Sequence, residues 1–182
     1  MKQLLILIFS LASCISFAQA NTKIIWEENN KLSWEDFQGE PSNVIPYHAN
    51  TSSGISYSWG LKGALNKFEL TYDVESFFIT DQSWVKPSYE NDHLLKHEQL
   101  HFDISELFAR KLREKLSKVD NSKLSKNSGG QLNKLYEDVA AERGLMQDQF
   151  DKETNHGSNK EAELKWQLKV VEELNKLAAF SN

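Results

Sequence analysis

Hydrophobic and polar residues alternate with a period of two in parts of the first half of the chain, most clearly at 55–59 and 68–74. This pattern is typical of half-buried strands, whose side chains point to opposite faces in turn. We expect residues 60–66 to connect two of the strands as a hairpin and residues 77–79 to form one more strand. The segments with clear strand character are residues 23–26, 55–59 and 68–74.

After about Ser88 the period lengthens to three and four residues, which predicts a long helix that ends near Lys118. Two more helices are predicted after it, separated by irregular segments at 120–131 and 151–160. Their apolar stripes are Leu135, Val139, Glu142 and Met146 in the first, and Leu164, Leu168, Val171 and Leu174 in the second. Strands followed by helices predict an α+β fold, with helices packed on an antiparallel sheet.

Composition narrows the possible functions. The chain has 182 residues, 40% of them hydrophobic, which is enough to bury one core. The net charge of −5 argues against a nucleic-acid-binding protein, which would carry a basic patch. The single Cys excludes a disulfide framework and a Cys-rich zinc finger. A metal ion in this chain must therefore be bound by His and carboxylate side chains.

The first twenty residues have the pattern of an export signal. Lys2 precedes an apolar run at residues 4–11, and Ala18-Gln19-Ala20 fits a cleavage site. We expect cleavage near Ala20 and a single domain at 21–182, secreted or periplasmic, with no transmembrane span. Cys14 ends a string that also resembles a lipobox, but the apolar residues that follow it favour cleavage after Ala20 over a lipid anchor.

His97-Glu98-Gln99-Leu100-His101 is an HExxH sequence within the first predicted helix. Residues four apart lie on one helix face, one turn apart, so both imidazoles can bind one metal ion. Glu98 would lie beside the ion and act as general base on zinc-bound water. Both histidines are in line with apolar residues and should face the interior, where an unpartnered polar group is costly. The motif therefore predicts a Zn²⁺ site at His97 and His101.

The third ligand is left open by spacing alone. A catalytic zinc ion takes three protein ligands and keeps one position open. His93 is two helical turns from His101, about 12 Å along the axis, so the two cannot easily share an ion. Two candidates remain: His156, in a polar segment that could return over the helix, and Glu142, on the apolar stripe of the second helix.

Most of the chain after the signal resembles a bacterial family called domain of unknown function 922, described as predicted secreted zinc-dependent proteases. Leu100 stands where that family usually has Gly, and Phe150 where it usually has Tyr, and neither difference removes a metal ligand. The strings that carry the resemblance are Leu32-Ser33-Trp34-Glu35-Asp36-Phe37-Gln38-Gly39, Ser83-Trp84-Val85, the HExxH sequence with Phe102-Asp103-Ile104, Phe150-Asp151-Lys152-Glu153-Thr154-Asn155-His156-Gly157, and Trp166.

The resemblance implies a zincin-like fold, with His156 rather than Glu142 as third ligand and Asp151 as a carboxylate that orients a ligating imidazole. The chain is thus expected to be a secreted zinc metallohydrolase, a peptidase acting on peptide or protein substrates. Two alternatives stay open: a non-catalytic envelope binding protein with a structural metal, and an amidase acting on cell-wall peptides. The sequence does not separate them, because specificity lies in pocket walls.

Overall fold

The computed structural model describes residues 22–42, 44, 46–64 and 67–182. The predicted export signal at residues 1–20, including Cys14, lies outside these residues. In the described part, no helix is both long and apolar enough to cross a membrane.

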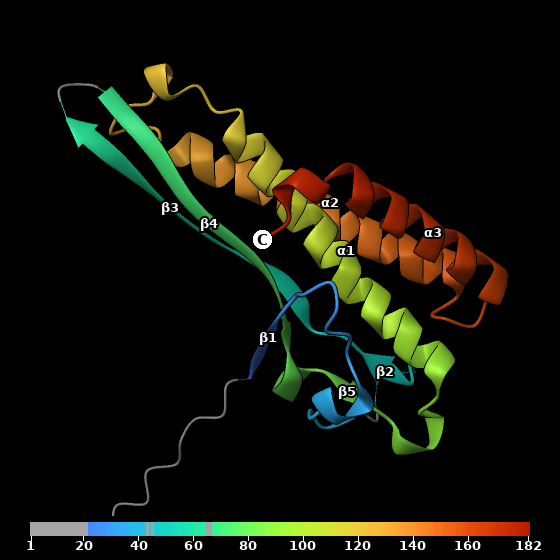
Figure 1. The fold of residues 1–182 in the computed structure, drawn as a ribbon. Helices are drawn as coiled ribbons and strands as arrows, with labels where there is room; N and C mark the ends of the chain where they lie inside the picture. Colours follow the sequence, from blue (N-terminus) through green and yellow to red (C-terminus); the bar gives the residue numbers. More distant parts are fainter. Residues whose placement is uncertain (1–21, 43, 45, 65–66) are drawn as a thin grey trace, which may run out of the picture.

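Two long antiparallel strands form most of the sheet (Figure 1). β3 (Ser53–Ala64) pairs with β4 (Lys67–Ile79) along its whole length, and β1 (Lys23–Ile25) pairs with the end of β4, so the strand order is β1-β4-β3. A second, two-stranded sheet joins β2 (Ala49–Asn50) to β5 (Trp84–Val85). Short 3₁₀ helices at Trp34–Asp36, Thr80–Gln82, Pro87–Tyr89, Asn121–Lys123 and Ala178–Phe180 lie in the connections.

The helices α1 (Asp92–Ser117), α2 (Gly129–Thr154) and α3 (Lys160–Lys176) follow the strands. The central one is α1, which contacts β3 and β4 as well as both other helices. Its start is fixed by the Asn91 side chain, which accepts a hydrogen bond from the backbone N–H of Leu94 at 3.0 Å. Side chains of α1 therefore connect the sheet to the helical layer.

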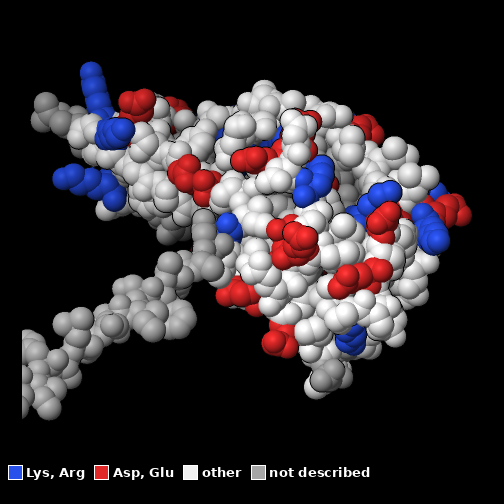
Figure 2. Space-filling model, turned by 60° about the horizontal axis from the view of Figure 1, so that its bottom comes forward, with Lys and Arg blue, Asp and Glu red and all other residues white. Residues whose placement is uncertain are grey.

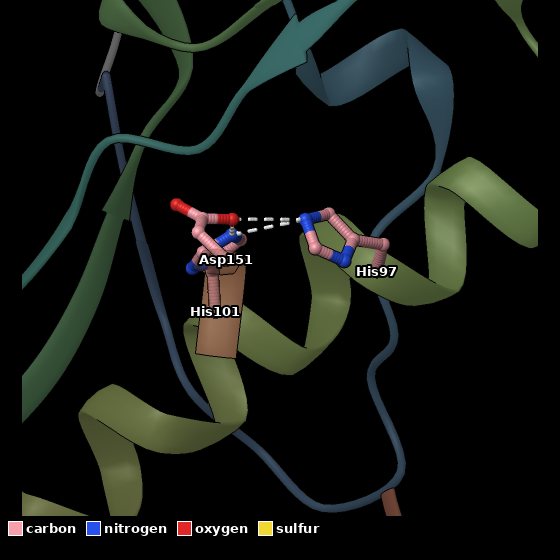
Figure 3. Close-up of side chains that lie close together, drawn as sticks. All are labelled: His97, His101 and Asp151. Atoms are coloured by element: carbon pink, nitrogen blue, oxygen red, sulfur yellow. Dashed lines mark hydrogen bonds and ion pairs between the residues drawn. The ribbon is translucent and has the colours of Figure 1, made fainter. Parts of the chain in front are cut away.

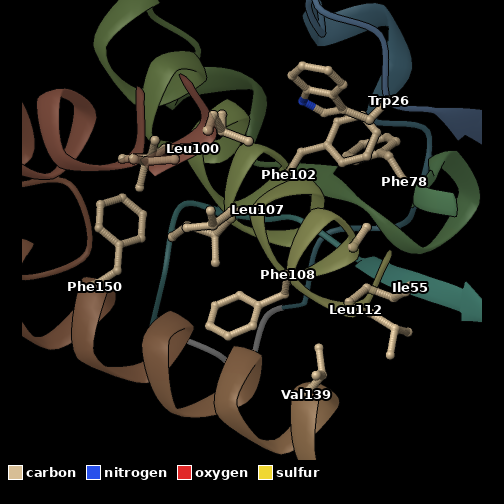
Figure 4. Packing of buried hydrophobic residues seen from close by; sticks show 14 of the residues in the cluster. Trp26, Ile55, Phe78, Leu100, Phe102, Leu107, Phe108, Leu112, Val139 and Phe150 are labelled. Carbon is tan, nitrogen blue, oxygen red and sulfur yellow. The ribbon is translucent and has the colours of Figure 1, made fainter. Parts of the chain in front are cut away.

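The main hydrophobic core surrounds α1 (Figure 4). On the sheet side, Phe102 packs near Phe78 of β4, with ring centroids 5.9 Å apart. On the other side the core includes Val139 and Phe150 of α2, both fully buried. Burying a side chain of this size contributes about 1.5–3 kcal/mol, so the two sides of α1 supply much of the stability that holds the helices to the sheet.

Helix α2 also reaches the edge of β3 that lies away from β4. The Tyr136 hydroxyl donates a hydrogen bond to the backbone oxygen of Ile55 at 3.2 Å. The Arg143 guanidinium donates to the backbone oxygen of Ser53 at 2.9 Å. Two acceptors that a neighbouring strand would otherwise satisfy are thus satisfied by helix side chains.

The predicted α+β class and the order of antiparallel strands followed by three helices are confirmed. The predicted boundaries differ in several places. Residues 77–79 are the end of β4 and not a separate strand, and β3 continues to Ala64, through most of the predicted hairpin connection at 60–66. The predicted irregular segment at 151–160 begins too early, because α2 continues to Thr154 and Asp151 is helical.

The apolar stripe predicted for α3 is wrong for three of its four residues. Leu168 is 64% exposed, and Leu164 and Val171 are also more than half exposed. The helix instead buries Glu163, Trp166, Val170 and Leu174. Two apolar stripes compete on this helix, and the one with the large Trp166 ring packs inward, against Phe150.

Acidic and basic side chains are interspersed over the face drawn in Figure 2, without a large area of one sign. The surface charge on this face therefore singles out no binding region. A charged cluster of a different kind lies in the interior, between α1 and the sheet.

Glu106 of α1 is the centre of this buried cluster. Its Oε1 accepts hydrogen bonds from Arg110 Nε at 2.9 Å and Arg113 Nη1 at 3.0 Å, and its Oε2 accepts one from Ser76 Oγ of β4 at 2.7 Å. Arg110 also donates to the backbone oxygen of Leu174 at 2.9 Å. The cluster connects α1 to β4 and to the end of α3.

We expect Glu106→Ala to lower the free energy of unfolding by about 3–5 kcal/mol, because it leaves two buried guanidinium groups without their carboxylate. The matched control is Glu114→Ala, which removes an exposed i,i+4 pair with Lys118 and should cost less than about 1 kcal/mol. Urea unfolding followed by circular dichroism measures both variants. Equal midpoints for the two would contradict the role assigned to the cluster.

Candidate metal centre

The two histidines of the HExxH sequence face Asp151 of α2 across the interface between helices (Figure 3). Asp151 Oδ1 lies 3.2 Å from His97 Nε2 and 3.1 Å from His101 Nε2. The two Nε2 atoms are 3.3 Å apart. All three donor atoms lie within 4.8 Å of one another, so this group could hold a metal ion.

The other nitrogen of each imidazole is also fixed. His97 Nδ1 donates to Oε2 of Glu163, a buried residue of α3, at 3.0 Å. His101 Nδ1 donates to Oε1 of Gln147, which lies on α2 one turn before Asp151. Phe150 stacks on the His97 ring with centroids 4.5 Å apart. Both rings are therefore oriented by hydrogen bonds of the kind that ligating histidines usually make.

Charge reinforces this geometry. Burial alone lowers the pKa of His97, but hydrogen bonds to Asp151 and Glu163 outweigh it and raise that pKa to about 9. Burial alone raises the pKa of Asp151, but hydrogen bonds from His101 and His97 outweigh it and hold that pKa well below its usual range. Metal ligands bind as neutral imidazole and carboxylate, so binding of an ion by this group would release the proton that His97 holds.

Glu98 lies between the two histidines in sequence and is also buried. Its backbone oxygen accepts a hydrogen bond from Thr51 Oγ1 at 3.2 Å. Its side-chain Oε2 is buried and has no hydrogen-bond partner among the described residues. A carboxylate oxygen in that situation is costly for the fold. No hydrogen bond from the described residues offsets this cost at Oε2.

These residues lie in a cleft of about 770 Å³. Its wall includes β2 and the start of β3, which bring backbone and polar side chains within reach of a bound molecule. The His97, Glu98, His101 and Asp151 side chains all contribute to its lining, together with Arg143 and Gln147 of α2 and with His156. A metal group at this position would be open to a substrate.

The two candidates for a third ligand lie in different places. His156 lines the cleft beside the group, with its Nδ1 3.4 Å from the same Asp151 Oδ1. Its side chain is 39% exposed and packs against Tyr47, with the two rings tilted by 31°. Glu142 is 52% exposed and pairs with Lys115 at 3.4 Å, away from the histidines. The atom in the third position of the group is a carboxylate oxygen of Asp151.

A left-handed turn at residues 155–157 brings α3 back against the histidines. Asn155, His156 and Gly157 have φ of 49°, 50° and 77°. The backbone oxygen of Gly157 accepts a hydrogen bond from His93 Nε2. A Cβ added at Gly157 would lie 3.2 Å from Cγ of His97, so a larger residue there would press on the ring, and the φ of 77° also favours glycine.

The family resemblance implies only an orienting role for Asp151, and no motif in the sequence points to Glu163, Gln147 or Arg143. The only sequence signal for Glu163 is its position, directly before Leu164 of the predicted apolar stripe. Asp151 belongs to one of the strings that carry the family resemblance, but the sequence places it in an irregular segment. In the structure it is helical and lies on the same face of α2 as Gln147.

Residues 79–157 match the model of a bacterial protein family of unknown function, DUF922. The match covers less than half of the chain but includes the HExxH sequence, Asp151 and His156. No curated protein and no solved structure matches the chain.

We expect Gly157→Ala to lower the free energy of unfolding by about 1–2 kcal/mol through its left-handed backbone alone. By displacing the His97 ring, it should also weaken the binding of a metal ion by this group about tenfold, as loss of an orienting contact does. Gly144→Ala is the matched control, since its Cβ meets nothing within 4 Å and alanine favours the helix. Urea unfolding and zinc titration against a chelating dye measure both; wild-type zinc affinity in Gly157→Ala would contradict the packing role.

Proposed function

We propose that this protein is a zinc-dependent metallohydrolase on a zincin-like scaffold, acting as a peptidase. The observation that carries the proposal is the buried Glu98 Oε2, which has no partner among the described residues and belongs to the same cleft as His97 and His101. A protein that used these histidines only for stability would have no need of such a carboxylate.

The residues present fit a zinc ion. Two imidazole nitrogens and one carboxylate oxygen are a common ligand set of catalytic zinc sites, in which a fourth position stays open. We assign His97, His101 and Asp151 as the ligands. A zinc ion bound by them would lower the pKa of water to about 7 and polarise a substrate carbonyl.

Glu98 would act as the general base. Its Oε2 takes a proton from the attacking water and then gives it to the nitrogen of the leaving amine, so that one carboxylate serves both halves of the reaction. Glu163 and Gln147 keep the two imidazoles in their orientation by accepting hydrogen bonds at Nδ1. The cleft binds the substrate and positions the bond to be cut.

His156 was predicted as the third ligand, and that prediction stays open to test. Its ring lies beside the Asp151 carboxylate and packs against Tyr47 at the cleft wall, so it would contact a substrate or join the ligand set. Export of the protein and a peptide substrate are likewise parts of the proposal that derive from the sequence.

Purified protein should bind one zinc ion per chain and hydrolyse members of a mixed peptide library. Glu98→Gln should keep the zinc and lose about 100-fold or more of the hydrolysis rate, because only the general base is removed. Glu114→Gln, on the same helix but away from the cleft, is the control. If the wild type binds zinc without hydrolysing any peptide, the protein is a binding protein with a structural metal. If it hydrolyses only cell-wall peptides, it is an amidase.

Three single variants decide the ligand set. Asp151→Ala should weaken zinc binding by more than the 10- to 100-fold typical of residues that only orient a ligand. His156→Ala should weaken it less, and Glu142→Ala should bind zinc like the wild type, since its side chain pairs with Lys115. Metal content after dialysis and competitive zinc titration measure this. Loss of zinc in His156→Ala with retention in Asp151→Ala would make His156 the ligand.

A further inference from the structure

The cleft beside the metal group contains one Arg or Lys side chain among its described lining residues, Arg143 of α2. Its Nη1 donates to the backbone oxygen of Ser53 at 2.9 Å and to Ser105 Oγ at 3.0 Å. Its Nε and Nη2 make no hydrogen bond to the described part of the chain. No carboxylate there lies within ion-pair distance of it, although Asp148 of the same helix also lines the cleft.

The other buried arginines of the chain show how unusual this is. Arg110 and Arg113 both form ion pairs with Glu106 at 2.9 and 3.0 Å. Arg143 is partly buried too, and burial lowers its pKa with only Tyr136 opposing the change. Holding a charge in a partly dehydrated place without a counter-ion costs free energy. The Ser53 backbone oxygen and Ser105 Oγ hold Nη1 of the guanidinium, but both are neutral and do not compensate its positive charge.

Arg143 is also connected to the metal group. Ser105 Oγ, which accepts from Arg143, donates to the backbone oxygen of His101 at 3.2 Å. Gln147, one helical turn after Arg143, donates to that same backbone oxygen at 2.8 Å and holds the His101 ring. The guanidinium therefore lies on the cleft wall next to the His101 side of the group, where part of a bound substrate would pass.

We propose that Arg143 recognises a carboxylate of the substrate. A guanidinium presents its free N–H groups as a planar fork that matches a carboxylate, and the pairing is strongest where water is partly excluded. The substrate class is then a peptide with a carboxylate near the bond that is cut, either its free C-terminus or an Asp or Glu side chain. This inference rests on the proposed function, whose site it refines.

The experiment uses zinc-loaded protein and matched peptide pairs. One pair differs in a free or amidated C-terminus, and the other has Glu or Gln at the same position. Binding is measured by titration calorimetry on Glu98→Gln, and kcat/KM is measured on the wild type. We expect about a 10- to 100-fold preference for the carboxylate member of at least one pair, the range for a hydrogen bond to a charged group. The pair that shows the preference identifies the source of the carboxylate.

Arg143→Gln should bring the ratio within that pair close to one, and Arg143→Lys should keep part of the preference because it retains the charge but not the fork. Lys134→Gln, an exposed lysine of α2 that pairs with Asp138, is the control and should keep the wild-type ratio. The melting temperature and zinc content of each variant show whether the site is intact. If Arg143→Gln does not fold, the Arg143→Lys ratio decides.

The outcomes separate this inference from the proposed function. Preferential binding of the carboxylate peptides without any turnover would support Arg143 and refute the hydrolase. Turnover with equal kcat/KM for both members of each pair would refute Arg143 and leave the hydrolase intact. A preference that persists in Arg143→Gln, with normal zinc content, would also overturn the assignment.

Discussion

The buried imidazole of His97 is the contact on which the arrangement of the three helices depends. It is carried by α1, its two nitrogens contact Asp151 of α2 and Glu163 of α3, and Gly157 of the turn between them packs against its ring. A polar ring can be buried this deeply only if both nitrogens have partners. Hydrogen bonds to Asp151 and Glu163 offset the cost of burying this ring, and they also fix its orientation in the metal group. Folding and formation of the site therefore depend on the same contacts.

The parts that could be predicted from the sequence are those set by local periodicity. Alternation identified β3 and β4, and spacings of three and four identified α1 and the inward direction of His97 and His101. The four-residue spacing of the two histidines placed them on one helix face, and their Nε2 atoms lie 3.3 Å apart. The class of the fold followed from the order of these elements, since strands came first and helices after.

What could not be predicted depends on contacts between elements. Asp151 becomes part of the group only because α2 continues to Thr154, into the segment where polar residues indicated a loop. On α3, two apolar stripes are nearly equivalent in sequence, and the choice between them is made by the fit of Trp166 against Phe150 and by the pairing of Glu163 with His97. Arg143 belongs to no sequence motif. That its charge has no ion-pair partner among the described residues follows only from the residues around it in the structure.

The coverage of the β3 edge by α2 has a consequence for the behaviour of the chain in solution. A long strand with unpaired backbone groups is a template for pairing with another molecule, which leads to aggregation. Tyr136 and Arg143 occupy the acceptors at the base of this edge, and the exposed Lys62 adds a charge towards its tip. Partial detachment of α2 would expose that edge of β3 and would also remove Asp151 from the metal group. Loss of the site and self-association of the protein should therefore occur together.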